Sequence, residues 1–280
     1  MKKTLAMILA LVMVLALSVP CFAVESDANG NKVFTSGELT QMNPISEENA
    51  IYYTSEDGIS YRNMYFDDLN SAVMALLAGK VDEIADIPQP VAEYIAAHND
   101  AIAWEFPHSY PLMIKLCMAV LKENNEVFDL LSNAISELTE SGKLEELKAE
   151  YIDAFLESGE EPEAAEMPKF DGAKTIRVAV SGDFPPIDYT MLDGTPAGFN
   201  VALLSAIAEL AKVNIELVPV STGARLVALT EDKVDAIFIS RDFYFIRKNS
   251  ELKKFNTDIP DALRITVPYY ECPNAQVFLK

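Results

Sequence analysis

Two arginines near the ends of expected strands have the clearest capacity for binding chemistry. Arg241 follows the apolar run 236–239, which is typical of a strand at the centre of a sheet. Ligands of open parallel sheets gather beyond the carboxyl ends of the strands, so Arg241 is expected to emerge at a binding cleft. A guanidinium there stays charged and can hold a carboxylate through two parallel hydrogen bonds. Arg225, shortly after Gly223, is a further candidate for the cleft, and a solvated position is its alternative.

The sequence contains no signature of catalysis or of a metal site. His98 and His108 are its only histidines, and neither has a metal-type partner nearby in the sequence. A nucleophile elbow, a phosphate-binding loop and an HExxH motif are all missing. The sequence therefore predicts no metal, no cofactor and no enzymatic activity.

The first residues have the pattern of an export signal. Two lysines precede the apolar run 5–17, which is too short to span a bilayer comfortably, and small residues precede a cleavage point after Ala23. No later segment is long and apolar enough to cross a membrane. We expect a protein of the periplasm or cell envelope. Cys21 leaves lipid anchoring as the alternative, although it follows Pro20 and not a small residue.

The charge balance excludes several classes of partner. The chain has 43 acidic and 22 basic residues, a formal net charge of −21. This argues against nucleic acid and against adhesion to anionic lipid, because both need lysine and arginine. It indicates an acidic surface that keeps a secreted protein soluble. Beyond the signal only Cys117 and Cys272 remain, and the sequence leaves open whether they pair or are buried separately.

Helices and strands are expected to alternate along both halves of the chain. Residues 33–61 are polar and give weak signals, whereas 157–169 is acidic with two prolines and is typical of a linker. The alternation implies α/β layers with mainly parallel sheets. Apolar periodicity predicts helices at 67–79 (capped by Asp67), 91–99, 127–138, 144–155, 200–212 and near 224–229, and strands at 81–87, 109–120, 175–180, 214–220 and 234–240.

A short internal sequence repeat, the internal echo, occurs once in each half of the chain. Residues 75–84 read ALLAGKVDEI and residues 228–237 read ALTEDKVDAI. Each is the expected end of a helix, a tight turn and the start of a strand. Joints of this kind are common, so the match can arise by chance; the alternative is two lobes of similar build on either side of the linker.

An ordered set of motifs occupies the last hundred residues. Gly-Asp-Phe-Pro-Pro begins at Gly182, Asp-Gly at Asp193, Gly-Phe-Asn at Gly198, Val-Asp-Ala at Val234 and Pro-Tyr-Tyr at Pro268. In this order and spacing, segment 173–280 resembles the first lobe of the bacterial extracellular solute-binding proteins, family 3, of amino-acid-type ABC transporters. The family has Asp where this chain has Asn in the third of these motifs.

The earlier segment 65–155 is similar to the second half of the same family. The resemblance lies in residues 75–82, 91–94 and 132–151. Because the segment similar to the family's second half comes first, the halves stand in swapped order, as in a circular permutation; a degraded tandem is the alternative. The resemblance implies a permuted α/β fold of the two-lobed type 2 periplasmic-binding-protein class, each lobe a mainly parallel sheet flanked by helices. The expected parts are a signal peptide at 1–23, a second-lobe-like segment at 24–106, a return segment with C-terminal-type helices that pack on the first lobe at 107–155, an acidic linker at 156–174 and a first-lobe-like segment at 175–280.

The function implied by the resemblance is extracytoplasmic capture of a small solute. An amino acid or a related small carboxylate would be delivered by a monomeric protein to the permease of an ABC-type transporter, with no cofactor, no metal and no nucleic acid. Two alternatives remain: an enzyme of the same fold, similar to a dehydratase, or a degenerate scaffold or sensor that no longer binds.

The resemblance also implies ligand-binding positions in both lobes. The family has an arginine clamp for a carboxylate shortly after the Val-Asp-Ala strand, and this chain offers Arg241 and Arg247 there. The polar and aromatic wall of the first lobe corresponds to Asp183, Phe184 and Tyr189, with Arg225 beside them. In the second lobe the family uses an Asp for an ammonium group. Asp86 is out of step with it and Gln89 is the substitute, which puts an amino-acid ligand in doubt.

Overall fold

The computed structural model describes residues 26–39, 51–54, 58–107, 113–241, 243–248, 251–256 and 261–280. The expected signal peptide with Cys21, and also His108, lie outside the described residues, as do the side chains of Arg241 and Arg247. Among the helices within these ranges, none has the length and apolar character needed to span a membrane.

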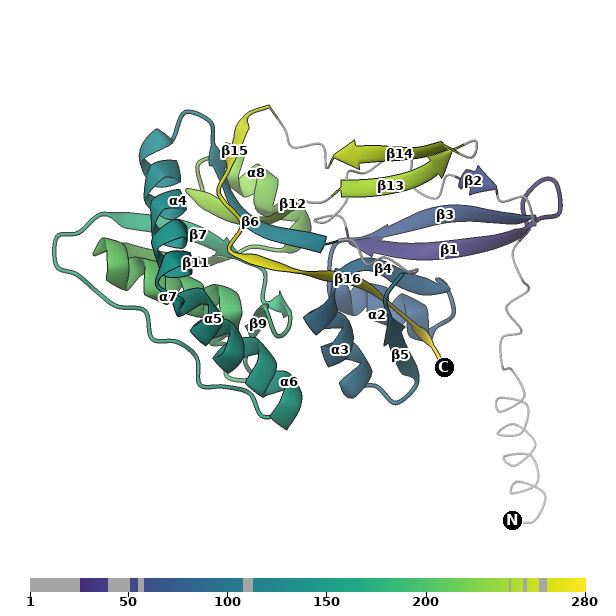
Figure 1. Ribbon diagram of the computed structural model, residues 1–280, viewed down its shortest axis with the longest axis horizontal. Coiled ribbons are helices and arrows are strands. Elements are labelled where there is room, and N and C mark those ends of the chain that lie inside the picture. Colours follow the sequence, from purple (N-terminus) through teal and green to yellow (C-terminus); the bar gives the residue numbers. More distant parts are fainter. Residues whose placement is uncertain are drawn as a thin grey trace, which may run out of the picture.

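The strands form a sheet that continues through two lobes (Figure 1). The strand β16 (Tyr270–Leu279) crosses between the lobes and pairs with a strand of each. Lobe 1 contains β11 (Asn214–Pro219), β7 (Thr175–Val180), β12 (Ala236–Arg241), β6 (Met113–Leu121) and β15 (Leu263–Ile265). Lobe 2 contains β4 (Glu83–Pro88), β1 (Lys32–Leu39), β3 (Ile59–Phe66), β2 (Ile51–Thr54) and β5 (Ile102–Glu105).

Each lobe repeats the same strand arrangement. In lobe 1, β11, β7 and β12 are parallel neighbours and β6 pairs antiparallel with β12. In lobe 2, β3, β1 and β4 are parallel neighbours and β16 pairs antiparallel with β4. The strands β6 and β16 also pair with each other, which makes them the connection between the lobes. The α/β fold class, predicted from the alternation of elements, is confirmed. The expectation of mainly parallel sheets is corrected: each lobe has a parallel core of three strands, but β6, β16, β15, β5 and β2 pair antiparallel, so the sheet is mixed.

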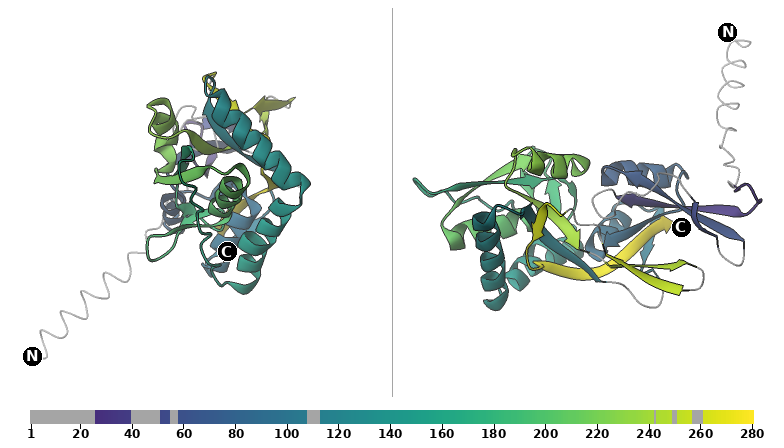
Figure 2. Two further views of the ribbon diagram at one scale, coloured as in Figure 1. Left: turned by 90° about the vertical axis from the view of Figure 1, so that its left-hand side faces the viewer. Right: turned by 90° about the horizontal axis from the view of Figure 1, so that it is seen from above.

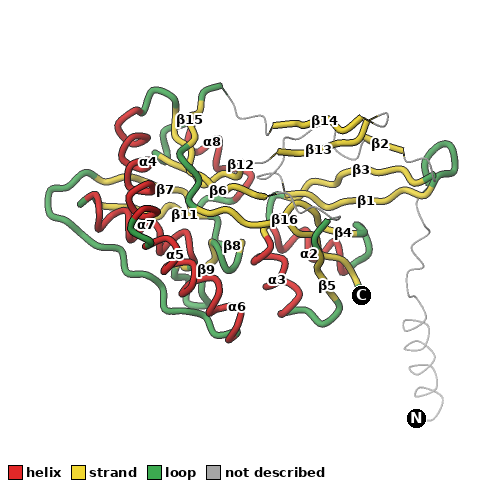
Figure 3. The backbone as a smooth tube through the Cα atoms, in the orientation of Figure 1, coloured by secondary structure: helices red, strands yellow, loops and turns green. Residues whose placement is uncertain are grey.

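Helices flank the strands of both lobes (Figure 3). The long helix α4 (Asn125–Glu140) buries an apolar face that runs from Val127 to Leu138. It packs against α7 (Phe199–Ala211). Lobe 2 has α2 (Leu69–Leu77) and α3 (Gln89–Ala97). Lobe 1 has α4 (Asn125–Glu140), α5 (Lys143–Lys148), the π-helical turn η1 (Ala149–Asp153), α6 (Ala154–Ser158), α7 (Phe199–Ala211), the short 3₁₀ turn η2 (Thr222–Ala224) and α8 (Arg225–Thr230).

Two sequence expectations about local structure are corrected. The helix expected at 67–79 begins at Leu69, and its cap is Asp68, whose Oδ1 accepts a hydrogen bond from the Ser71 amide at 2.7 Å. The polar stretch 33–61 contains β1 and, from Ile59, β3, which pair in parallel over eight positions. Polar residues of β1 such as Thr35 and Glu38 are buried in the sheet, so the usual apolar alternation of a strand is missing.

Further strands lie where the sequence signals were weak. β8 (Asp183–Phe184), β9 (Asp188–Thr190) and β10 (Pro196–Ala197) form a small sheet between β7 and α7. β13 (Phe243–Lys248) and β14 (Glu251–Asn256) pair as an antiparallel ribbon. The first group follows directly on β7 and builds the loop region that borders the pocket described below.

The acidic linker is an extended strap along lobe 1 (Figure 2). Residues 159–170 contain neither helix nor strand, as the composition predicted. Ser205 of α7 donates a hydrogen bond to the Glu166 carbonyl at 2.6 Å, and the Phe170 amide donates to Asn214 Oδ1 at 2.8 Å. Met167 packs against the main core. The second half of the strap is therefore bound to lobe 1.

The internal echo of Lys-Val-Asp has the same structural role in both lobes. In lobe 1, Asp235 donates its amide to the Arg177 carbonyl at 2.8 Å, and its Oδ2 accepts from the Arg177 amide at 2.7 Å. In lobe 2, Asp82 makes the corresponding bonds to the carbonyl and amide of Thr35, both at 2.8 Å. Each aspartate thus joins the start of one strand to its parallel neighbour. This equivalence favours two lobes of similar build over a chance match.

Candidate functional site

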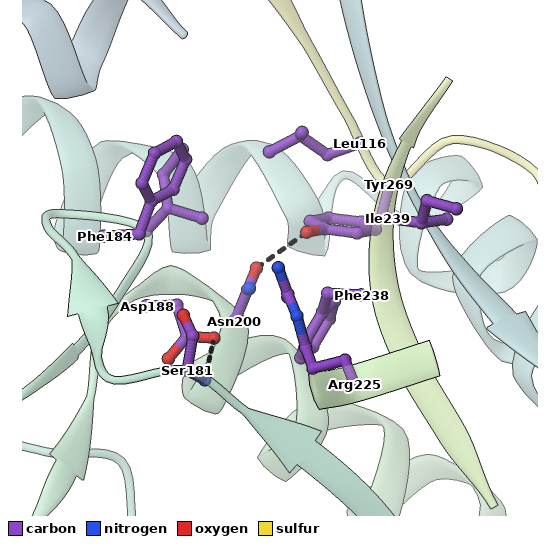
Figure 4. A pocket seen from close by; sticks show the side chains of 10 residues that line it. Leu116, Ser181, Phe184, Asp188, Asn200, Arg225, Phe238, Ile239 and Tyr269 are labelled. Carbon is purple, nitrogen blue, oxygen red and sulfur yellow. Dashed lines mark hydrogen bonds between the residues drawn. The ribbon is translucent and has the colours of Figure 1, made fainter. Parts of the chain in front are cut away.

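A pocket of about 30 Å³ lies in lobe 1 at the carboxyl ends of β7 and β12 (Figure 4). This is where open parallel sheets place their ligands. Its wall combines an apolar side with a group of buried polar side chains. The lining residues are Leu116, Ser181, Phe184, Ile187, Asp188, Asn200, Arg225, Phe238, Ile239 and Tyr269.

Arg225 is the cationic side chain of this pocket. It is the first residue of α8, only 6% of its surface is exposed, and its side chain points toward Asn200 and Tyr269 (Figure 4). Among the described residues it has no hydrogen-bond or ion-pair partner. Burial lowers the pKa of Arg225, and the nearby carboxylates of Asp188 and Asp183 act in the opposite direction. The guanidinium therefore has carboxylates nearby but none in hydrogen-bond contact, which leaves its N–H groups available to an anion that enters the pocket.

Asn200 and Tyr269 form a buried hydrogen-bonded pair beside Arg225. Asn200 lies in the first turn of α7, and its Oδ1 accepts a hydrogen bond from the Tyr269 hydroxyl at 2.8 Å. Burial raises the pKa of Tyr269 well above its usual value, so the hydroxyl keeps its proton. In the structure the hydroxyl is the donor of this pair and Asn200 Oδ1 is the acceptor.

Asp188 shapes the loop at the edge of the pocket. Its two carboxylate oxygens accept hydrogen bonds from the amides of Ser181 and Gly182, each at 3.0 Å. Gly182 has φ +72°, and a Cβ there would lie 2.3 Å from Thr190 Oγ1. The carboxylate thus holds a tight turn that only glycine fits. Burial raises the pKa of Asp188, and the two amide bonds oppose that effect.

Two of the residues predicted for lobe 1 line the pocket, namely Phe184 and Arg225. Asp183 lies beside it, and its Oδ2 accepts a hydrogen bond from the Leu69 amide at the start of α2, at 3.4 Å. Tyr189 is buried outside the lining. Its ring centroid is 5.7 Å from that of Phe155, which is 5.6 Å from that of Tyr94 on α3. Asp183 and Tyr189 therefore lie where the two lobes touch.

The remaining predicted residues are distributed over other strands and helices. Asp86 of β4 has φ +52° and accepts a hydrogen bond from Asn274 Nδ2 at 2.8 Å, and burial raises its pKa. Gln89 begins α3 and donates to Glu93 Oε1 at 2.7 Å. The structure does not bring Asp86 or Gln89 into the lining of the pocket. The backbone of Arg241 ends β12 and Arg247 belongs to β13, so the clamp role of their side chains stays a prediction.

Sequence reasoning missed the three buried polar residues Asp188, Asn200 and Tyr269. A signal for two of them was present, because Asn200 and Tyr269 stand within the Gly-Phe-Asn and Pro-Tyr-Tyr motifs. The motifs mark the positions, but their sequences do not reveal that the two side chains meet across 69 residues of chain.

The comparison with protein families agrees with the resemblance drawn from the motifs. Residues 176–242 match the sequence profile of bacterial extracellular solute-binding proteins, family 3. The match runs from β7 to the end of β12 and contains most of the residues that line the pocket. Over this segment, about a quarter of the chain, the resemblance is confirmed. No curated protein matches the sequence.

Solved structures with a similar course of the chain were also found. The probable amino-acid ABC transporter extracellular-binding protein ytmK from Bacillus subtilis is 10% identical, with 89% of this chain and 84% of that chain covered and a TM-score of 0.38. An ancestral arginine-binding protein bound to arginine is 12% identical, with coverages of 89% and 84% and a TM-score of 0.39. NikA from Staphylococcus aureus, in complex with Ni(L-His)2, is 16% identical with a TM-score of 0.37, and 65% of this chain is covered. This chain spans 40% of the length of NikA, and between 38% and 64% of several other matched structures.

Proposed function

We propose that the chain is an extracytoplasmic solute-binding protein that captures a small carboxylate and presents it to an ABC-type transporter. The family match over 176–242 supports the class of protein, because it covers the segment that builds the pocket. Reversible capture needs two lobes that move about a connection, and β6 and β16 provide paired strands between the lobes.

The observation that carries the proposal is the buried guanidinium of Arg225, which lacks a hydrogen-bond partner among the described residues. A guanidinium buried to this degree normally has a carboxylate in hydrogen-bond contact. The carboxylate of Asp188, which also lines the pocket, is occupied by two backbone amides. A solute carboxylate would supply the missing partner through charge-assisted hydrogen bonds. The apolar side chains Phe184, Ile187 and Phe238 line the same pocket and would contact the hydrocarbon part of such a solute once the lobes open to admit it.

Contacts between the lobes support closure over the pocket. The start of α2 in lobe 2 reaches Asp183 beside the pocket, and Asp67 lies against Gly223, two residues before Arg225. A Cβ at Gly223 would lie 2.8 Å from Asp67 Oδ1, so the two lobes approach closely at this point. Closure over a bound solute removes water and strengthens its contact with Arg225.

The order of the halves and the export of the chain belong to the same proposal. The helices α4 to α6 precede the strap and pack on the lobe that follows it, as a permuted order of the family would require. We further propose removal of the signal peptide after Ala23. Mass spectrometry of protein recovered from outside the cytoplasm should give an N-terminus at Val24; a lipid-modified Cys21 at the N-terminus would contradict this.

The proposal is tested by ligand screening with two substitutions of the same residue. Thermal shift of the full mature protein against short-chain carboxylates, 2-oxo acids and amino acids should reveal a stabilising compound. Calorimetry should then show that Arg225→Met abolishes measurable binding, a loss of about 2–5 kcal/mol, whereas Arg225→Lys retains part of it. Normal binding by Arg225→Met would disprove the role of this residue.

The screen also separates the alternative functions. A compound that stabilises the protein and is recovered unchanged, as shown by NMR of the mixture, identifies a binding protein. A compound that is chemically converted identifies an enzyme of this fold. If no compound in the panel stabilises the wild type, a scaffold that no longer binds becomes the better account.

A further inference from the structure

We propose that Asn200, held by Tyr269, completes a site of hydrogen-bond donors around Arg225 that accepts a carboxylate and rejects the matching neutral amide. The inference rests on the proposed function, since it describes how the same pocket selects its solute. It assigns Asn200 as a residue that contacts the solute and Tyr269 as a positioning residue that acts through Asn200.

The hydrogen bonds of Asn200 are divided between the two ends of its amide. The side chain is only 3% exposed. Its Oδ1 is engaged by the Tyr269 hydroxyl at 2.8 Å, while its Nδ2 has no partner among the described residues. Among the described residues, the fully buried side-chain atoms without a partner are Asn63 Oδ1, Ser132 Oγ and Tyr189 Oη. Asn200 Nδ2 is therefore open to the pocket, where an acceptor can reach it. That acceptor would lie between Nδ2 and the guanidinium of Arg225, which points toward the same side chain (Figure 4).

Tyr269 can keep this orientation because its own ring is tightly held. Its ring centroid lies 6.0 Å from that of Phe199 and 5.6 Å from that of Phe238. The hydroxyl stays protonated and donates to Asn200 Oδ1. In this arrangement the Asn200 amide has its oxygen on Tyr269 and its NH₂ group free to face the pocket.

In the resulting site, Asn200 Nδ2 and Arg225 offer donors and one positive charge to a solute, while two backbone amides hold the carboxylate of Asp188 and the Tyr269 hydroxyl holds Asn200 Oδ1. A carboxylate oxygen can accept from both Asn200 Nδ2 and Arg225. A neutral amide of the same shape would place an NH₂ group where the site also offers donors, or would bind through its carbonyl oxygen alone without the charge. The substitution Asn200→Asp would instead pair with Arg225 internally and occupy the place of the solute carboxylate.

The contact between positions 200 and 225 is tested without any ligand. In ligand-free protein, Asn200→Asp should raise the melting temperature at neutral pH, because the buried guanidinium gains a partner. In an Arg225→Met background the same substitution should lower it, because the introduced carboxylate would then be a buried charge near Asp188 and Asp183. Equal shifts in the two backgrounds would show that the residues do not interact and would overturn the inference. This result is independent of whether the natural solute has been found.

Selectivity is tested with propanoate and propanamide, which differ only in the head group. By calorimetry, the wild type should bind propanoate and not propanamide, and Asn200→Asp should weaken propanoate at least about tenfold. Tyr269→Phe frees the amide to rotate, so it should weaken propanoate and admit propanamide. The matched control is Tyr270→Phe, which removes the hydroxyl of the buried neighbouring tyrosine outside the pocket lining.

The outcomes of the selectivity test separate the two proposals. Equal behaviour of Tyr269→Phe and Tyr270→Phe would overturn the positioning role of Tyr269. Strong binding of propanamide by the wild type would overturn the donor-only site. If the wild type binds neither compound while positions 200 and 225 are coupled in the ligand-free protein, the donor site stands and the carboxylate solute of the proposed function is wrong.

Discussion

At the scale of single residues, lobe 2 contains a carboxyl group whose pKa is displaced into the neutral range. Glu83 lies on β4, and burial is the main cause that raises the pKa of Glu83 to about 7. The negative charges of Asp86, Asp82 and Glu105 add to this effect, and a hydrogen bond with Ser36 opposes it. The protonated form is therefore the one that the folded state favours.

This displacement predicts a loss of stability as the pH rises. Because the pKa of Glu83 is higher in the folded than in the unfolded chain, its favourable contribution is complete below about pH 4.5 and disappears as the pH approaches 7. Glu83→Gln should remove this loss and stabilise the protein at pH 8 by up to about 3 kcal/mol. Solvent screening at this half-buried site makes the gain smaller than that maximum. Urea denaturation at pH 5 and pH 8 measures it, with Glu216→Gln at an exposed position of β11 in lobe 1 as control. An unchanged pH dependence in Glu83→Gln would contradict the assignment.

Only some of the residues that line the pocket could be predicted from the sequence. Phe184 and Arg225 could be placed from the sequence because they follow recognisable turns at the ends of β7 and β11. Asn200 and Tyr269 could not, since burial of a polar side chain depends on which distant partner meets it. Local periodicity reports whether a face of an element is apolar, but not which two polar groups satisfy each other inside the core.

At the scale of elements, the aspartates of the repeated Lys-Val-Asp motif hold parallel strands in register. Asp235 and Asp82 each accept a backbone amide of the neighbouring strand and return a bond from their own amide. In lobe 1 the side chain of Arg177 adds three hydrogen bonds to the pair of Asp235 and Asp232 carboxylates. These charged partners raise the pKa of Arg177.

Substitution of these aspartates should destabilise both lobes by a similar mechanism. Asp235→Ala and Asp82→Ala each leave a strand amide without its acceptor, which costs about 1–3 kcal/mol. Asp232→Ala, at an exposed position, should cost less than about 1 kcal/mol. Chemical denaturation monitored by circular dichroism compares the three variants. If Asp232→Ala were as destabilising as Asp235→Ala, the backbone bonds would not be the source of the effect.

The same scale explains which elements could be predicted. Strands such as β6 and β12 contain continuous apolar runs, and α4 has a clear apolar face. β1 instead buries Thr35, Ser36 and Glu38, so its sequence is that of a polar loop. Its strand character comes from pairing with β3 and β4, which is tertiary information.

At the scale of the whole molecule, lobe 1 is assembled from segments on both sides of the strap. β6 precedes the strap and pairs with β12, which follows it, from Arg241 opposite Lys115 to Ile237 opposite Ala119. α4 also packs on α7 across the same division. The strap joins these parts covalently, but the sheet and the core already hold them together.

Cutting the strap should therefore leave the molecule intact. A specific protease site placed within residues 159–166 and cleaved in the folded protein should give two fragments that migrate together in size-exclusion chromatography without denaturant. In urea the fragments should separate. Separation under native conditions would show that the halves on either side of the strap are independent domains, and it would contradict the proposed permuted arrangement.

The pairing of β6 with β12 has a consequence for biosynthesis. When Leu121 has been synthesised, the two partners of β6 in the sheet of lobe 1, β12 and β15, are still more than about a hundred residues away along the chain, as the pairing of Ala119 with Ile237 and Ile265 shows. Contacts of this sequence separation raise the contact order and slow folding. The apolar faces of β6 and α4 must therefore wait for the last third of the chain. Lobe 1 therefore cannot be completed before the last third of the chain has been synthesised, so its folding follows synthesis and does not accompany it.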